Sequence, residues 1–442
     1  MVFKMEINIR DLGARTTDIL QTEIIQKAID DCFLAGGGTV RIPKGIYRSG
    51  GLRLRSNVTL YLESGAILEG SSDYKDYFAF LDDKIEPITQ EELEKFEKLP
   101  SRSANPYSQW SNGFIRGIYA KNCAIIGEEF SYIDGMACYD PNGEEKYRGP
   151  HPLSFYGCEN VTLKGYTIRR SANWAHNFVE SKNLVFKDVT VYGGHDGLDI
   201  RSCDNVLIEN CFIDSGDDAI AGFNNNDVVI KDSTLGSSCS LIRFGGNNVV
   251  FDNCKSLPQG SFGFRGHLTD EAKAASHMTN EKCKHSTTCI FLYYCDFRAE
   301  INRTPGNITI KNCNFEDCMR IFRLNWNENY VWCCNRVLEQ LKFENCTFNN
   351  VSDSIYVHGD PEHPMNLEFE NCVINVKPGF EDKEIAVGID FGTMTFKNVT
   401  LNGYKNPRII KKTEGKVIIE NSTEMEIVEE YIENTSFNSL TV

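Results

Sequence analysis

Three aspartates in the middle of the chain are spaced so that they could lie together in one catalytic site. Asp217 and Asp218 are adjacent, directly after Gly216, and they follow Asp196 by 21 and 22 residues. A lone aspartate in such a context is more often a turn residue. Carboxylic acids gathered in one place raise one another's pKa values, so one can keep a proton and act as a general acid while the others stay ionised. The three residues therefore predict acid–base chemistry, provided that the fold brings them together.

The interval between these aspartates is also the period of a repeat. Short segments that begin with a polar residue, usually Asn, and then alternate apolar and polar residues start at 160, 183, 205, 227 and 248. These starts are 23, 22, 22 and 21 residues apart. Alternation with period two predicts a strand in each copy, and repeats of this length without helices between their strands predict a parallel β-helix. Stacked coils then place the aspartates on adjacent coils at the same angular position.

Three segments do not follow this rhythm. An amphipathic helix over residues 18–33 precedes the first coil and predicts an N-terminal cap over about residues 11–40. Interruptions at about 71–117 and 268–302 predict insertions between coils, and insertions on one face of a solenoid often form its binding site. We expect residues 1–442 to form one all-β domain, a single-stranded parallel β-helix with a capping helix.

The sequence resembles glycoside hydrolase family 28, the polygalacturonases. The resemblance covers roughly residues 11–265 and is densest from His195 to Ala221, which reads HDGLDIRSCDNVLIENCFIDSGDDAIA. The family has Asp-Gly-x-Asp and, about one coil later, Gly-Asp-Asp, and both are present here. What the resemblance implies is a right-handed parallel β-helix of the pectin-lyase-like superfamily. It further implies hydrolysis of O-glycosidic bonds in pectic or related oligosaccharides, with inversion at the anomeric carbon.

The resemblance also implies a role for each aspartate. Asp217 would protonate the leaving oxygen, and Asp196 and Asp218 together would activate the water, which is the division of labour that glycoside hydrolysis requires. Consecutive strand residues point to opposite faces, so Asp217 and Asp218 can share a site only at a bend or bulge, and we predict such a distortion there. Asp199, which ends the Asp-Gly-x-Asp segment, is expected to support the site.

Other residues near these coils are candidates for substrate binding. The family's carboxylate-binding Arg-x-Lys is best matched by Arg265-Gly266-His267, and the family's His one coil after Gly-Asp-Asp is replaced by Cys239. Compared with the family, the acid–base residues are therefore present, whereas the residues that bind a substrate carboxylate are different. Arg201 and Arg243 either bind a substrate anion or pair with the aspartates. The full set of substrate-binding candidates is Trp174, His176, Asp199, Arg201, Arg243, Arg265 and His267.

Two other functions stay open at this point. One is a β-helical polysaccharide lyase, in which the aspartates hold Ca²⁺ and an arginine abstracts a proton. The other is a catalytically silent carbohydrate-binding solenoid, which the replacement of the family His motivates. The sequence does not identify the sugar, the linkage, exo or endo action, or the oligomeric state.

The composition limits the kinds of molecule that the protein is expected to bind. The formal net charge of −16 argues against nucleic acid or an anionic membrane surface. No run approaches the roughly 18 apolar residues of a membrane span, and the first ten residues have no signal-peptide pattern. We expect a cytoplasmic enzyme whose partner is an oligosaccharide and which uses no cofactor or metal.

The cysteines fit the repeat. There are seventeen of them, and six occupy the same position directly after the second Asn or its equivalent: Cys123, Cys211, Cys254, Cys313, Cys346 and Cys372. A free cysteine behaves as a small buried hydrophobic residue, so we predict reduced thiols stacked inside the coil. A metal site at Cys283, His285, Cys289 and Cys295 is the weaker alternative, because its spacing is unlike that of zinc sites.

Overall fold

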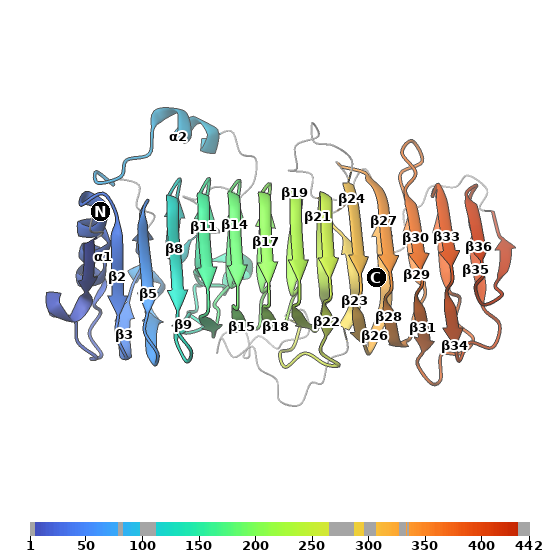
Figure 1. The fold of residues 1–442 in the computed structure, drawn as a ribbon, viewed down its shortest axis with the longest axis horizontal. Helices are drawn as coiled ribbons and strands as arrows, with labels where there is room; N and C mark the ends of the chain where they lie inside the picture. The colour runs from blue at the N-terminus through green and yellow to red at the C-terminus, as the bar shows by residue number, and fades with distance from the viewer. Residues whose placement is uncertain are drawn as a thin grey trace.

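The computed structural model describes residues 5–77, 83–97, 112–264, 287–295, 306–326, 333 and 336–431. In these ranges nearly all regular structure is β-strand, and parallel strands stack side by side along the molecule from the N-terminal helix to the last coil (Figure 1). The chain forms a right-handed parallel β-helix, which confirms the predicted fold class. No helix in the described part of the chain is long and apolar enough to cross a membrane.

Three ladders of parallel strands run along the molecule, and a typical coil gives one strand to each. The first ladder contains β4 (Leu52–Leu54), β7 (Gly113–Ile118), β10 (His151–Tyr156), β13 (His176–Val179), β16 (Leu198–Arg201), the first parts of β19 (Ile220–Lys231) and β21 (Ser240–Asp252), β23 (Thr287–Tyr293), β26 (Cys318–Asn325), β29 (Ile355–His358), β32 (Ala386–Ile389), β35 (Arg408–Lys411) and β37 (Glu426–Glu429).

The second ladder follows the first along each coil. It contains β1 (Met5–Asn8), β2 (Gly38–Ile42), β5 (Val58–Leu62), β8 (Lys121–Gly127), β11 (Glu159–Lys164), β14 (Lys182–Lys187), β17 (Asp204–Glu209), the later parts of β19 and β21, β24 (Gly306–Lys311), β27 (Leu338–Glu344), β30 (Asn366–Glu370), β33 (Thr393–Lys397) and β36 (Lys416–Glu420).

The third ladder closes each coil and forms a separate sheet. It contains β3 (Gly45–Ser49), β6 (Ala66–Gly70), β9 (Tyr132–Asp134), β12 (Thr167–Arg169), β15 (Thr190–Gly193), β18 (Phe212–Ser215), β20 (Thr234–Ser237), β22 (Lys255–Ser256), β25 (Asn314–Glu316), β28 (Thr347–Val351), β31 (Val373–Val376) and β34 (Thr400–Asn402). The turn between the third ladder and the next first-ladder strand is where the aspartates lie.

Identical positions of successive repeats lie directly against one another. Leu184, Val206, Val228 and Val249 are in register on β14, β17, β19 and β21, and all four are buried. Their burial removes the apolar half of each alternating strand from water, which is the main driving force for stacking. The asparagines at one turn of each coil also stack on one another, and they have positive φ. Asn183 donates a hydrogen bond to Asn160 and accepts one from Asn205, each over 2.8 Å.

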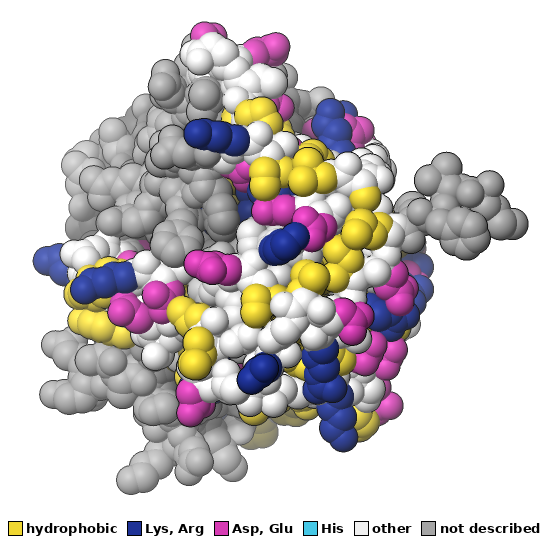
Figure 2. Space-filling model, turned by 90° about the vertical axis from the view of Figure 1, so that its left-hand side faces the viewer, with side chains coloured by type: hydrophobic (Ala, Val, Ile, Leu, Met, Phe, Trp, Pro, Cys, Tyr) yellow, Lys and Arg dark blue, Asp and Glu magenta, His cyan; other side chains and the backbone are white. Residues whose placement is uncertain are grey.

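The first coil is covered by α1 (Thr22–Leu34), which lies at the blue end of the molecule beside β2 (Figure 1). Its buried residues are Ile25, Ala28, Ile29 and Cys32. The helix predicted over residues 18–33 is therefore present. Figure 2 shows this end of the molecule from outside, with hydrophobic side chains scattered among acidic and basic ones.

The other helices in the described residues are short: η1 (Ile9–Leu12), η2 (Tyr74–Asp76), α2 (Gln90–Glu97) and η4 (Glu144–Lys146). Both predicted insertions overlap strands of the first ladder. Gly113–Ile118 forms β7, and Thr287–Tyr293 forms β23, which pairs with β21 and β26. The insertions expected at about 71–117 and 268–302 thus each contain a strand that is in register with the coils. The organisation as one domain stays a prediction.

The described cysteines are all free, and the six in the repeat position are all buried. The backbone N–H of Cys254 lies 3.3 Å from the Sγ of Cys313 on the next coil. The predicted internal stack is therefore confirmed. Of the alternative metal set, Cys289 is part of β23, and the backbone of Cys295 forms an isolated parallel β-bridge with that of Cys333, both thiols being free. Cys283 and His285 lie outside the described residues.

Candidate active site

The three aspartates lie in two equivalent bends on adjacent coils. Asp196 lies between β15 and β16, and Asp217 and Asp218 lie between β18 and β19. All three are buried, with exposed fractions of 4%, 3% and 1%. Because neither Asp217 nor Asp218 belongs to a strand, their side chains are not bound by strand alternation. The distortion predicted at this pair is present as a bend.

The strand register places Asp196 directly against Asp218. Leu198 of β16 pairs with Ile220 of β19, so the residues two positions before them occupy the same place in successive coils. The backbone N–H of Gly197 donates to the carbonyl oxygen of Asp218 over 3.0 Å. The one-coil spacing in the sequence therefore becomes a direct stacking of two carboxylate-bearing bends.

Close backbone packing fixes the second bend. A Cβ atom on Gly216 would lie 2.5 Å from the carbonyl oxygen of Gly194 and 2.6 Å from that of Gly263. No other residue fits this position without moving one of the two backbones. On the other side, the Ser237 hydroxyl donates to the carbonyl oxygen of Asp217 over 2.5 Å. The residue preceding the Asp pair is thus glycine for a packing reason.

Asp218 has two donors that suit an ionised carboxylate. Nη1 of Arg243 lies 3.4 Å from its Oδ2, and the backbone N–H of Ser240 donates to its Oδ1 over 3.3 Å. Burial nevertheless raises the pKa of Asp218 above its ordinary value, and the charge of Arg243 offsets this only in part. A carboxylate with a raised pKa is a stronger base while it remains ionised near neutral pH.

Asp217 has a cationic neighbour that the sequence analysis did not identify. Nη2 of Arg148 lies 3.9 Å from Oδ2 of Asp217, and the Arg148 side chain is buried. The same guanidinium donates to Oδ1 of Asn173 over 3.2 Å and to Glu145 over 3.3 Å. Arg148 lies in the irregular segment between β9 and β10, where no repeat sets a register, so no spacing in the sequence connects it with Asp217.

Cys239 occupies the position next to the pair, on the following coil. Its sulfur and one oxygen from each of Asp217 and Asp218 all lie within 4.8 Å of one another. Burial raises the pKa of the Cys239 thiol, so the thiol is neutral at physiological pH. These three atoms are close enough to act as metal ligands, but the charges of Arg148 and Arg243 already lie beside the two carboxylates.

Arg201 and Asp199 form a buried ion pair. Nε of Arg201 donates to Oδ1 of Asp199 over 2.6 Å, and Nη2 of Arg201 donates to Oδ1 of Asn177 over 3.0 Å. The guanidinium also lies 4.5 Å from the centroid of the Trp174 ring. Of the two alternatives for Arg201 and Arg243, pairing with aspartates is the one observed. Trp174 is half-buried and supports Arg201.

His176 does not line the site, contrary to expectation. It is fully buried inside the coil, where Nε2 lies 3.0 Å from the hydroxyl of Tyr166 and Nδ1 lies 3.1 Å from the carbonyl oxygen of Gly197. Burial lowers its pKa to about 4, so it is neutral. Strand alternation turns His176 inward together with Phe178. Arg265 and His267 lie outside the described residues.

Comparisons with known proteins identify glycosidases and other proteins with similar sequences. Residues 103–240 match the model for glycosyl hydrolases family 28. The chain is 24% identical to the exo-poly-alpha-D-galacturonosidase of Dickeya chrysanthemi, over 90% of this chain and 74% of that protein. It is also 36% identical to alginate lyase 7 of Azotobacter vinelandii, over 44% of this chain but only 20% of that protein.

A solved structure shows the same fold. The exopolygalacturonase of Thermotoga maritima superposes with a TM-score of 0.62 at 18% identity, over 91% of this chain and 93% of that one. The family match covers both aspartate bends, and the matched fold extends along nearly the whole chain. The resemblance to glycoside hydrolase family 28 is therefore confirmed, and this parallel β-helical protein is a glycosidase resembling the polygalacturonases.

Proposed function

We propose that the protein hydrolyses O-glycosidic bonds in pectic oligosaccharides, with inversion, at the aspartates Asp196, Asp217 and Asp218. The observation that carries this proposal is the stacking of Asp196 on Asp218 with Asp217 in the same bend. Three buried carboxyl groups on two coils provide both a proton donor and a base for one sugar. The relative from Dickeya chrysanthemi, whose name specifies galacturonoside cleavage, supports pectic substrates.

The roles divide between the two faces of the reacting sugar. Asp217 protonates the oxygen of the leaving group, and Asp196 and Asp218 together deprotonate the attacking water. Asp218 suits the base role because burial raises its pKa while Arg243 and the Ser240 N–H stabilise its ionised form. Arg148 beside Asp217 and Arg243 beside Asp218 offset part of the negative charge of the carboxylates, which would otherwise repel an anionic sugar.

The spacing of the carboxyl groups limits where the attacking water can bind in the proposed mechanism. Asp217 and Asp218 have oxygens within 4.8 Å of each other. Inverting glycosidases hold their acid and base carboxyl groups roughly 6.5–9.5 Å apart to leave room for the water. The oxygens of Asp217 and Asp218 are closer than this range, so the proposed inverting mechanism requires the water to be held between Asp218 and Asp196 on the adjacent coil.

The test is product identification on short oligogalacturonates and on neutral oligosaccharides of matched length. Proton NMR of the first-formed product should show the anomer opposite to that of the substrate. Retention would reject the inverting mechanism, and a product with an unsaturated, ultraviolet-absorbing ring would establish a lyase instead. Binding without turnover of any glycan would establish a carbohydrate-binding solenoid.

A further inference from the structure

The outer face of the first ladder continues past the aspartates as one in-register column. Its members are Asp199, Ala221, Arg243, Leu292, Arg323, Tyr356, Val387, Ile410 and Val428, on β16, β19, β21, β23, β26, β29, β32, β35 and β37. Their strand neighbours are mostly core residues, so the column faces outward. A ligand that lies along this column meets the residues in this order.

Arg323 differs from the other arginines of this face. It makes no ion pair or side-chain hydrogen bond with any residue that the structure describes. Arg243, earlier in the column, pairs with Asp218, and Arg320, on the same strand as Arg323, pairs with Asp353. Arg323 is half-buried. A partly desolvated guanidinium without a counter-ion is a strong site for a carboxylate, which it can bind through two parallel hydrogen bonds.

Tyr356 lies directly beside Arg323 on the next coil. The two residues pair in register, and the guanidinium of Arg320 lies 6.0 Å from the centroid of the Tyr356 ring. Tyr356 is half-buried, and its pKa is raised by burial, although Arg323 and Arg320 oppose the shift. Its hydroxyl is therefore a neutral donor and acceptor, and its ring gives an apolar surface for the face of a sugar.

We propose that Arg323 and Tyr356 form a distal subsite for a uronic acid residue of the same oligosaccharide that is cleaved at the aspartates. This inference rests on the proposed function. Leu292 lies between Arg243 and Arg323, so the two arginines are two strand spacings apart, roughly 10 Å. An oligosaccharide along the column places one sugar at the aspartates while the carboxylate of a more distant sugar binds Arg323.

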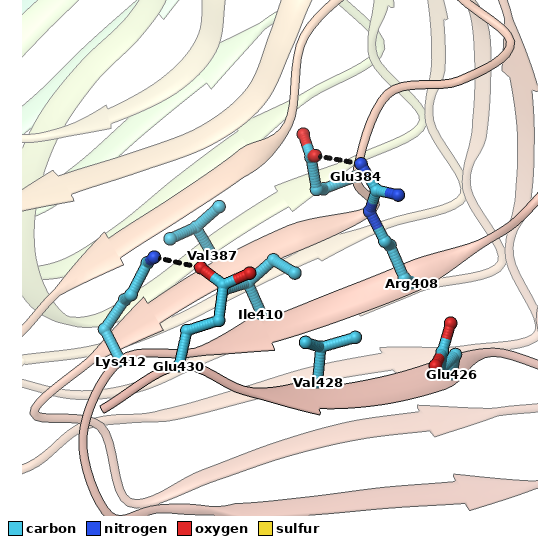
Figure 3. Close-up of a pocket in the computed structure, with 8 residues that line it drawn as sticks. All are labelled: Glu384, Val387, Arg408, Ile410, Lys412, Glu426, Val428 and Glu430. Atoms are coloured by element: carbon cyan, nitrogen blue, oxygen red, sulfur yellow. Dashed lines mark hydrogen bonds and ion pairs between the residues drawn. The ribbon is translucent and has the colours of Figure 1, made fainter. Parts of the chain in front are cut away.

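The same face further along provides a contrast. Figure 3 shows a hollow whose floor is formed by Val387, Ile410 and Val428 of the column. Its two cations are already neutralised: Arg408 pairs with Glu384 over 2.6 Å, and Lys412 pairs with Glu430. The hollow therefore has no free positive charge for a carboxylate. Arg408 is consequently a matched control for Arg323, because it is an arginine on the same face that is paired.

The experiment compares Arg323→Gln and Arg408→Gln on oligogalacturonates of increasing length. For Arg323→Gln, KM should rise roughly 10–100-fold for substrates long enough to reach the subsite, which corresponds to the loss of a charge-assisted hydrogen bond. KM for the shortest cleaved substrate, and kcat for all lengths, should stay at the parent values. Arg408→Gln should leave both unchanged. Thermal unfolding checks that each variant is folded.

A binding measurement keeps the subsite separate from the catalytic proposal. Calorimetry with the Asp217→Asn protein, with and without Arg323→Gln, measures affinity for long oligogalacturonates and for neutral oligosaccharides without any turnover. Affinity for the uronates that depends on Arg323, in a parent protein that cleaves no uronate, would reject the proposed function but support the subsite.

Three results would overturn the subsite. One is cleavage with the same chain-length dependence in the parent and Arg323→Gln proteins, which would leave the proposed function standing. Another is an equal loss of affinity for neutral oligosaccharides, since a carboxylate would then not be the group bound. The third is absence of binding of oligogalacturonates of every length to the parent protein, which would reject both proposals.

Discussion

The guanidinium of Arg243, on the coil after the Asp217–Asp218 bend, lies beside the carboxylate of Asp218, with its Nη1 3.4 Å from Oδ2 of Asp218. The same group lies 4.1 Å from the centroid of the Tyr294 ring. Burial opposes the charged form of Arg243, but the carboxylates of Asp218 and Asp196 raise its pKa above the ordinary value. Arg243 therefore keeps its charge, and this charge lowers the pH at which Asp218 can act as the proposed base.

Replacing Arg243 should shift the pH profile. Burial raises the pKa of Asp218 and Arg243 lowers it, so Arg243→Gln raises that pKa further. A base is lost as the pH falls through its pKa, so the acidic limb of kcat/KM should move to higher pH in the variant. The measurement is kcat/KM against pH for both proteins. An acidic limb at the same or lower pH would show that Asp218 is not the base that titrates there.

Asp217→Asn should lower kcat roughly 10²–10⁴-fold, the usual contribution of a general acid. A substrate with a good leaving group needs no proton on its leaving oxygen, so the variant should recover much of its activity on an activated aryl glycoside. Asp188→Asn is the control, since Asp188 lies on another turn of the coil, where it accepts from Asn210. Full activity of a folded Asp217→Asn protein on natural substrates would show that Asp217 is not the acid.

The buried thiols should resist alkylation in the native protein. Cys211, Cys254, Cys313 and Cys346 are each at most 3% exposed, and none is in a disulfide. Mass spectrometry after treatment with a small alkylating agent should find them unmodified until the protein unfolds. Reducing agents should leave the thermal midpoint unchanged. Rapid native labelling of these four residues would contradict the internal stack.

Asn183→Ala should destabilise the fold by about 1–3 kcal/mol for two reasons. It removes two hydrogen bonds, to Asn160 and from Asn205. It also places alanine at a φ of 56°, a left-handed conformation that asparagine tolerates better because its polar side chain can form hydrogen bonds. Asn183→Gly keeps the backbone conformation accessible and loses only the hydrogen bonds, so its loss should be smaller. Chemical denaturation measures both. Equal losses would show that the left-handed conformation contributes nothing.

The sequence was sufficient for every feature that depends on the repeat. A period of about 22 residues becomes a stack of coils, so equal positions in the repeat become neighbours in space. For this reason the meeting of Asp196 with Asp218, the buried cysteines and the parallel fold were all predictable. The bend at Asp217 and Asp218 was predictable as well, because two adjacent side chains cannot share a site within a regular strand.

Features outside the repeat needed the tertiary structure. Arg148 reaches Asp217 from an irregular segment, and no spacing fixes the path of a chain that has no repeating contacts. His176 lies two residues from the half-buried Trp174 yet points into the core, because the bend before β13 decides which residues face inward. The unpaired charge of Arg323 is also a tertiary property: a sequence shows that an arginine is present, but only the positions of the surrounding carboxylates show that no described residue pairs with it.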